Sequence, residues 1–183
     1  MACQGKLRHP NRFITTTDDK GKAILDHSIP AKAPFYTIAD DEVNFAQCYV
    51  TRGFPTTLDD GEDLKIYGDF LKDPPGLTVS NGTVLRYVDM PPKALSPMHV
   101  TTSIDYGVLL EGEVNLVLDS GEESALKRGD ICIQRATMHA WRNTSDTEWA
   151  RMLFVLQPVK PIVRQGKEVK EDLGGMTGVK LST

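Results

Sequence analysis

The chain has 183 residues, of which 40% are hydrophobic and 25% charged, a composition typical of one globular domain with extensions. The formal net charge of -4 argues against a nucleic-acid binder, which needs a dense basic surface for phosphates. No apolar run approaches the ~20 residues of a membrane-spanning helix, so no membrane attachment is predicted. The first six residues lack the apolar segment of a secretory signal, and we therefore expect a cytoplasmic protein.

Residues 1–80 form a mixed region that we expect to be an N-terminal arm and extension packing on the main body. Residues 13–17 and 45–51 are rich in β-branched and aromatic side chains and are typical of strands. A short helix is predicted within residues 59–71. Its acidic residues cluster at the start, where they favour the helix dipole, and its apolar residues fall roughly on one face.

Residues 81–160 are strand-rich and are predicted to form the core of the fold. Turn signals at Gly112, at 119–121 and at 128–130 separate short apolar segments. Many short strands with regularly spaced turns indicate an all-β sandwich or barrel. Residues 161–183 are polar and glycine-bearing, and we expect a loose C-terminal tail, with packing of part of it on the barrel as the alternative. The expected strands are 83–90, 97–101, 105–110, 113–118, 123–127, 130–134, 138–143 and 148–157.

Two histidines lie in this strand-rich region, and they carry a resemblance to a known family. The first segment places His99, Thr101, Asp105 and Gly112 in order, and the second places Gly129, His139 and Asn143. These spacings resemble the two motifs of the cupin superfamily, with Thr101 at the second histidine position and Asp105 at the glutamate position. The resemblance implies an all-β, cupin-type jelly-roll β-barrel, here with N-terminal arm strands and a short helix.

The resemblance also implies that His99, Asp105 and His139 converge inside the barrel. As a set of two imidazoles and one carboxylate they would suit a single divalent metal, namely zinc, iron or manganese. However, Thr101 is a poor replacement for an imidazole, and aspartate is one methylene shorter than glutamate. The expected cofactor is therefore either none or one divalent metal, and the sequence favours none.

Without a metal, the same three residues are predicted to be catalytic acids and bases. Histidine exchanges protons near neutral pH, and a carboxylate can orient an imidazole and stabilise its cation. An apolar lining would raise the pKa of the carboxyl group. The matching reactions are dehydration, decarboxylation and proton shifts beside a carbonyl. The alternative for each histidine is a core residue with satisfied hydrogen bonds.

Five further residues are candidates for binding the substrate. Arg86 alternates with Leu85 and Tyr87, and facing inward it would bind a carboxylate or phenolate through two hydrogen bonds. Residues i and i+2 of a strand share a face, so Thr101 is expected beside His99 and Trp141 beside His139. Two residues of the N-terminal arm are expected to cap the barrel, namely Tyr36 and Arg52.

The favoured function is a small-molecule enzyme of the lyase or isomerase type. The sequence of the motif segments is similar to that of cupins from fungal and bacterial small-molecule pathways. This resemblance implies an aromatic or polyketide-type substrate in secondary metabolism. The alternatives are a metal-dependent cupin dioxygenase and a non-catalytic ligand-binding cupin. The expected partners are a small molecule and a second copy of the chain, because strands at 12–17 and 45–51 could pair between protomers. Neither nucleic acid nor membrane is expected.

Overall fold

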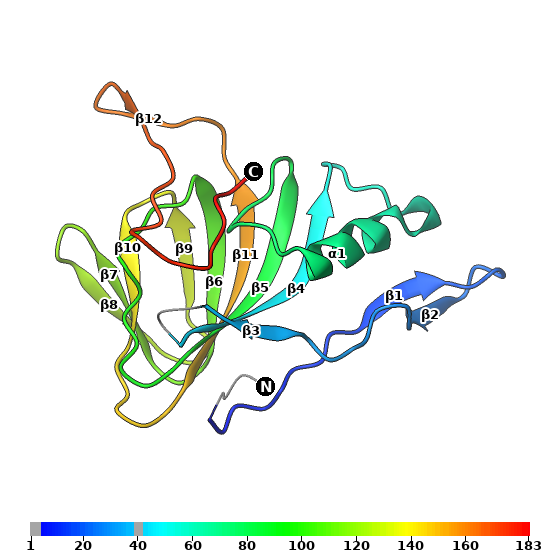
Figure 1. Cartoon of the computed structure of the whole chain (residues 1–183), viewed down its shortest axis with the longest axis horizontal. Helices are drawn as coiled ribbons and strands as arrows, with labels where there is room; N and C mark the ends of the chain where they lie inside the picture. Colours follow the sequence, from blue (N-terminus) through cyan, green and yellow to red (C-terminus); the bar gives the residue numbers. More distant parts are fainter. Residues whose placement is uncertain (1–4, 39–41) are drawn as a thin grey trace.

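The computed structural model describes residues 5–38 and 42–183, and its centre is a pair of antiparallel sheets that enclose the core (Figure 1). The larger sheet has the order β3-β4-β5-β11-β6-β9 and the smaller one the order β10-β7-β8. This is the all-β jelly-roll barrel predicted from the sequence. The larger sheet consists of β3 (Phe35–Thr37), β4 (Asn44–Arg52), β5 (Gly82–Met90), β6 (Ser103–Glu111), β9 (Ile131–Arg135) and β11 (Ala150–Pro158).

The smaller sheet closes the opposite wall of the barrel and consists of β7 (Val114–Leu118), β8 (Glu123–Leu126) and β10 (His139–Asn143). The two-residue alternation of β11 shows how the core is filled. Met152, Phe154 and Leu156 point inward and are at most 8% exposed. The residues between them face the other side of the sheet. Burial of these apolar side chains is the main driving force that holds the two walls together.

A single helical segment packs beside β4 and consists of η1 (Asp59–Gly61) and α1 (Glu62–Lys72). The helix begins after Gly61, which has a φ of 65° that glycine adopts without strain. Tyr67 is fully buried and donates a hydrogen bond to the carbonyl oxygen of Gln47 at 2.8 Å. The predicted short helix is confirmed.

The N-terminal region contributes more to the barrel than an added arm would. Ala33 and Phe35 pack on the outer face of β4 and β5, against Ala46 and Cys48. Strand β4 itself is an internal strand of the larger sheet. The predicted boundary at residue 80 therefore cuts through the barrel, because β4 reaches its partner β5 only through long-range pairing that a local pattern does not reveal.

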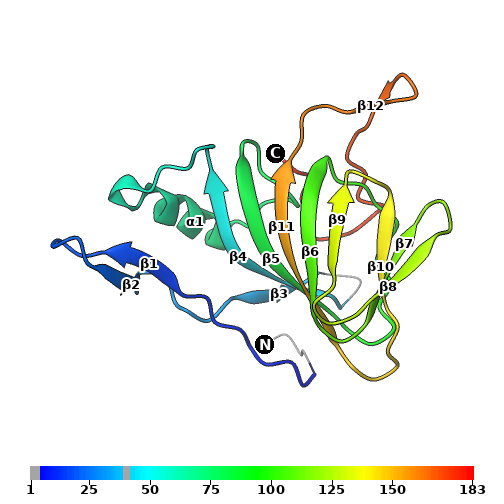
Figure 2. The ribbon, with the colours of Figure 1, turned by 180° about the vertical axis from the view of Figure 1, so that it is seen from behind.

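A hairpin of β1 (Ile14–Thr17) and β2 (Ala23–Asp26) projects away from the barrel (Figures 1 and 2). Phe13, Ile24 and Leu25 on this arm are 70%, 45% and 45% exposed.

The homodimer stays a prediction, for which analytical ultracentrifugation should give twice the chain mass of 20.2 kDa. Replacing Ile24 and Leu25 with serine is expected to shift the protein toward monomer. A wild-type protein that sediments as a monomer at micromolar concentration would contradict it.

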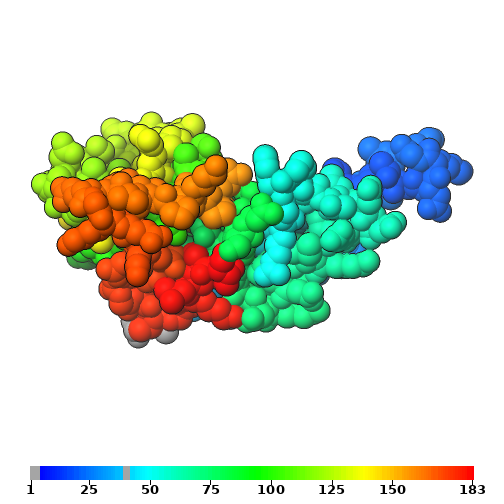
Figure 3. Space-filling view, turned by 90° about the horizontal axis from the view of Figure 1, so that it is seen from above, coloured from blue at the N-terminus to red at the C-terminus, as the bar shows by residue number. Residues whose placement is uncertain are grey.

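The C-terminal segment is folded against the barrel and is not a loose tail. After the small hairpin of β12 (Val163–Arg164) and β13 (Lys167–Glu168), Asp172 pairs with Val100 through two backbone hydrogen bonds. The backbone of 180–181 then passes so close to Gly76 that a Cβ there would lie 2.4 Å from the Leu181 carbonyl oxygen. Figure 3 shows this segment in red at the surface of the molecule.

The other predicted strands of the core are confirmed with shifts of one or two residues at their ends. The expected strand at 97–101 is reduced to isolated bridges, in which His99 pairs with His139 and Val100 with Asp172. The short strands β2, β3, β12 and β13 are not predicted from the sequence, because two to four residues carry too little periodicity. None of the described helices is long and apolar enough to cross a membrane.

Candidate active site

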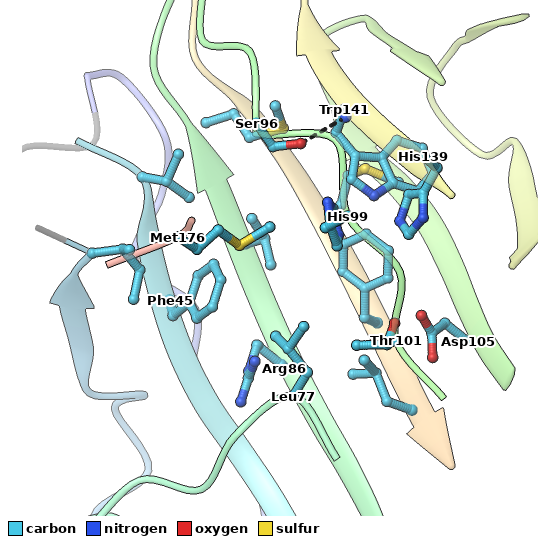
Figure 4. A pocket seen from close by; sticks show the side chains of 17 residues that line it. Phe45, Leu77, Arg86, Ser96, His99, Thr101, Asp105, His139, Trp141 and Met176 are labelled. Carbon is cyan, nitrogen blue, oxygen red and sulfur yellow. Dashed lines mark hydrogen bonds between the residues drawn. The ribbon is translucent and has the colours of Figure 1, made fainter. Parts of the chain in front are cut away.

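The candidate site is an internal pocket between the two walls of the barrel (Figure 4). Its free volume is about 80 Å³. Apolar side chains from β4, β5 and β11 make up most of the lining, and the polar groups come mainly from β5, β6, β10 and the segment before β6. The polar and charged lining residues are Arg86, Ser96, His99, Thr101, Asp105 and His139.

His99 and His139 form a pair because the backbone places them opposite each other. The N–H of each residue donates to the carbonyl oxygen of the other, at 2.8 and 2.9 Å. Residues paired in this way project their side chains from the same face of the ladder. Their rings are accordingly 4.2 Å apart between centroids, tilted by 47°, and both side chains are buried.

Backbone carbonyl groups fix the orientation of both imidazoles. Nδ1 of His99 lies 2.8 Å from the carbonyl oxygen of Pro97, and Nδ1 of His139 lies 2.9 Å from that of Thr137. A carbonyl oxygen only accepts, so the proton of each neutral ring resides on Nδ1. Each Nε2 then carries a lone pair, and within the described part of the chain neither Nε2 has a hydrogen-bond partner. The predicted orienting role of Asp105 is wrong, because these carbonyls perform it.

Burial keeps both imidazoles neutral. It lowers the pKa of His139 to about 3, and the neighbouring His99 ring acts in the same direction. Burial likewise lowers the pKa of His99, against the favourable contact with the Pro97 carbonyl. Two cationic rings at this separation would repel each other, so the pair holds at most one extra proton.

Asp105 lies on β6 beside Thr101, with the two histidines further along the pocket (Figure 4). Burial raises the pKa of Asp105 to about 6, with the hydroxyl of Ser103 and the charge of Arg86 acting in the opposite direction. Its Oδ1 atom is buried and has no hydrogen-bond partner in the described residues. The carboxyl group can therefore change protonation state close to neutral pH.

This shift predicts a specific pH dependence of stability. Below its ordinary pKa of 3.8 the Asp105 carboxyl is neutral in both states, whereas above about pH 6 the folded protein carries a buried charge. The contribution of Asp105 to stability therefore falls as the pH rises from about 4 to 6. Asp105→Asn is expected to raise the free energy of unfolding by roughly 1–3 kcal/mol at about pH 7.5, and by little at about pH 4. Urea unfolding of both proteins checks this, and parallel pH profiles would contradict it.

His99, Asp105 and His139 do not form the predicted set of metal ligands. Among residues 5–38 and 42–183, no group of three or more His, Cys, Asp or Glu side chains lies close enough to hold one ion. The paired imidazoles supply two nitrogen donors, while Thr101 occupies the position of a further histidine. The residues present thus do not fit a metal site with three or four protein ligands.

The other predicted binding residues are divided between the pocket and the surface. Thr101 and Trp141 line the pocket as the alternation predicts, and Trp141 contacts the His139 ring edge-on at 5.6 Å. Tyr36 lines an adjoining cavity of about 210 Å³. Arg52 lines neither cavity, so its predicted role is wrong. It ends β4, where the chain turns toward α1, and its guanidinium lies 4.8 Å from the Phe70 ring centroid.

Sequence reasoning did not assign most of the apolar residues that line the pocket, nor Ser96. Met176, from the C-terminal segment, lines the pocket opposite the strands. Phe45 of β4 forms another part of its wall. Ser96 accepts a hydrogen bond from the backbone N–H of Trp141 at 2.9 Å and so joins the segment before His99 to β10. The local pattern at 174–178 carries no sign of the role of Met176, because the contact is between distant parts of the chain.

Comparison with known proteins is consistent with this architecture. The family model described as "Cupin domain" matches residues 86–156. "Phomopsin biosynthesis cluster protein C'" of Diaporthe leptostromiformis is 48% identical over 174 residues, covering 95% of this chain and 89% of the relative. "Oryzines biosynthesis cluster protein J" of Aspergillus oryzae is 37% identical over 164 residues, covering 90% and 91%.

A further relative bears a name that includes the domain. "Cupin-domain-containing oxidoreductase srdB" of Neurospora crassa is 36% identical over 171 residues, covering 92% of this chain and 83% of the relative. Among solved structures, the cupin domain of Schizosaccharomyces pombe Cnp3 aligns with 82% of this chain and 88% of its own, with a TM-score of 0.49 and 12% identity. Fold and pocket together define a jelly-roll barrel with an internal histidine pair. The chain belongs to the cupin superfamily, and its relatives include proteins of fungal biosynthesis clusters.

Proposed function

We propose that the chain is an enzyme of small-molecule biosynthesis that moves protons on an apolar substrate held inside the barrel. The class is a lyase or isomerase, and the substrate is of the aromatic or polyketide type. One observation carries this proposal. Two buried imidazoles stand side by side, each with Nδ1 fixed to a carbonyl oxygen and with no described residue bonded to its Nε2. The relatives named after the phomopsin and oryzines clusters support the biosynthetic setting.

The proposed chemistry starts with proton removal by Nε2 of one imidazole. In an elimination, this atom takes a proton from a carbon beside a carbonyl group, and the C–H electron pair becomes a C=C bond. The C–O bond on the next carbon breaks at the same time. The leaving hydroxyl then takes the proton from the imidazolium and departs as water, which restores the neutral ring. In an isomerisation, the same proton returns to a different carbon.

Because the pKa of His139 is low, proton transfer from a protonated His139 to the substrate is favoured. An imidazolium in this apolar pocket is a strong acid, so it readily gives its proton to a leaving group or a carbanion. The neighbouring ring stays neutral when the first is protonated, because two cations would repel each other. Asp105, with a pKa of about 6, is a second proton carrier in the same pocket.

The names of four relatives favour a second candidate, an oxidoreductase that uses the same pocket. Besides srdB, the "cupin-domain-containing oxidoreductase virC" of Hypocrea virens is 37% identical over 166 residues. The corresponding fogC of Aspergillus ruber is 36% identical over 166 residues. The two candidates predict different changes in the mass of the substrate.

Mass spectrometry of the converted substrate tests both candidates. The coding gene would be deleted in the producing organism, and the accumulating metabolite incubated with purified wild-type protein or His139→Gln. Loss of water or carbon dioxide, or an isomer of unchanged mass, is expected from the wild type alone. A gain of oxygen or a loss of hydrogen would replace this proposal with the oxidoreductase. Binding of the metabolite without conversion would indicate that the protein is a non-catalytic ligand-binding cupin.

A further inference from the structure

The guanidinium group of Arg86 is buried at the boundary of two cavities and is only partly satisfied. The residue is 1% exposed. Nη2 donates to the side-chain oxygen of Gln47 at 3.1 Å and to the carbonyl oxygen of Gly76 at 2.8 Å. Nε and Nη1 are buried and have no partner in the described residues. Two of its donor nitrogens are therefore free to hold a ligand.

No described residue forms an ion pair with Arg86, although the carboxylate of Asp105 in the same pocket favours its charged form. By contrast, the other deeply buried arginine, Arg151, forms a double hydrogen bond with Asp89. The Phe45 ring, 4.8 Å from the Arg86 Cζ, provides only a weak attraction. Burial without a partner disfavours the charged form and lowers the pKa of Arg86. A cation kept in this state is costly to the fold unless an anion completes it.

The two cavities that meet at Arg86 differ in character. Ile38, Phe45 and Arg86 line both of them. The histidine pocket is otherwise mainly apolar, whereas the adjoining cavity contains Tyr36, whose phenol is a further hydrogen-bond donor. A molecule with an anionic head and an apolar body would place its head at Arg86 and its body toward the imidazoles.

We propose that Arg86 anchors the carboxylate of an apolar carboxylic acid, and that such acids are the substrate class of this pocket. The proposal rests on the proposed function only in calling the bound acid a substrate. Nε and Nη1 each carry an N–H that no described residue accepts, so either nitrogen can donate a charge-assisted hydrogen bond to a carboxylate oxygen. An anion in the pocket would also raise the pKa of both imidazoles toward neutrality, where proton transfer is most effective.

Isothermal titration calorimetry with matched acids and amides tests the proposal. The probes are phenylacetate and hexanoate, each compared with its primary amide, phenylacetamide or hexanamide. Wild-type protein is expected to bind at least one acid at least tenfold more tightly than its amide, since a charge-assisted pair replaces a neutral contact. Arg86→Met is expected to lose this preference. Equal affinity of the wild type for acid and amide, or no binding of either acid, would overturn the proposal.

A second arginine provides the matched control. Arg12 also has unpartnered Nε and Nη1 atoms and stacks on an aromatic ring, that of Tyr67 at 5.1 Å, but it lines neither cavity. Arg12→Met is expected to keep the preference for acids. The melting temperature of Arg86→Met is expected to equal or exceed that of the wild type, because the variant removes an unpaired buried charge. If Arg86→Met fails to fold, Arg86 is structural and the proposal falls, unless a crystal structure of wild-type protein with phenylacetate places the carboxylate within hydrogen-bond distance of Nε or Nη1 of Arg86.

The binding assay separates this proposal from the proposed function. His139→Gln retains Arg86 and is expected to bind the acids as the wild type does, although it converts substrate much more slowly. Acid binding that disappears in Arg86→Met but persists in His139→Gln supports the anchor. Its support does not depend on whether the reaction is an elimination, an isomerisation or an oxidation.

Discussion

Replacing His139 with glutamine is expected to lower turnover by about 10²–10⁴-fold, the usual contribution of a positioned general acid or base. The side chain of His139 is buried and lines the pocket, and the amide of glutamine cannot exchange protons in the same pH range. Product formed per enzyme, measured by chromatography and mass spectrometry, gives the effect. His99→Gln is expected to act similarly, and the double variant to be little worse than either, because the two rings work as a unit.

His27, which is exposed and distant in sequence from the pocket residues, provides the control. His27→Gln is expected to leave turnover unchanged. The free energy of unfolding of His139→Gln is expected to lie within about 2 kcal/mol of the wild type. Full activity in His139→Gln would remove the histidine from the mechanism. Loss of the fold together with activity would assign His139 a structural role instead.

The second large effect is expected on stability, at the buried ion pair between Arg151 and Asp89. Their side chains are 6% and 0% exposed, and two hydrogen bonds of 2.6 and 2.5 Å join them. Asp89→Ala leaves the guanidinium buried without its counter-charge, which is expected to cost about 3–5 kcal/mol of unfolding free energy. Arg151 also donates to the carbonyl oxygen of Arg8 at 2.6 Å, so the N-terminal segment is expected to loosen as well. Urea unfolding and proteolysis of that segment measure both effects.

A partly exposed pair provides the comparison. Arg142 and Glu123 also form a double hydrogen bond, but their side chains are 38% and 37% exposed. Glu123→Gln is expected to cost less than about 1 kcal/mol, since water stabilises the remaining charge. Equal losses of unfolding free energy in Asp89→Ala and Glu123→Gln would show that burial does not determine how much the Asp89–Arg151 pair contributes to stability.

The elements that the sequence predicts well are those set by neighbouring residues. Alternation along a strand correctly places Thr101 beside His99 and Trp141 beside His139 in the pocket. In each case the geometry within one strand decides where the side chain points.

The features that the sequence does not predict depend on contacts between distant segments. Met176 reaches the pocket only because the C-terminal segment pairs with Val100, 72 positions before Asp172 in the numbering. Arg52 is expected at the barrel mouth, but the stacking on Phe70 of α1 holds it outside. The distance between Asp105 and the histidine pair depends on how two sheets face each other, which a motif spacing does not encode.

The protonation state of the two pocket histidines is the most direct test of the proposed proton-transfer site. Nitrogen-15 NMR of histidine-labelled protein, assigned with His99→Gln and His139→Gln, reads both the tautomer and the titration of each ring. Both rings are expected to be neutral at neutral pH with the proton on Nδ1, with the pKa of His99 below its ordinary value of 6.5 and that of His139 at about 3. A ring that carries its proton on Nε2, or that titrates at its ordinary value, would contradict the central claim that this barrel presents two uncommitted imidazole lone pairs to its pocket.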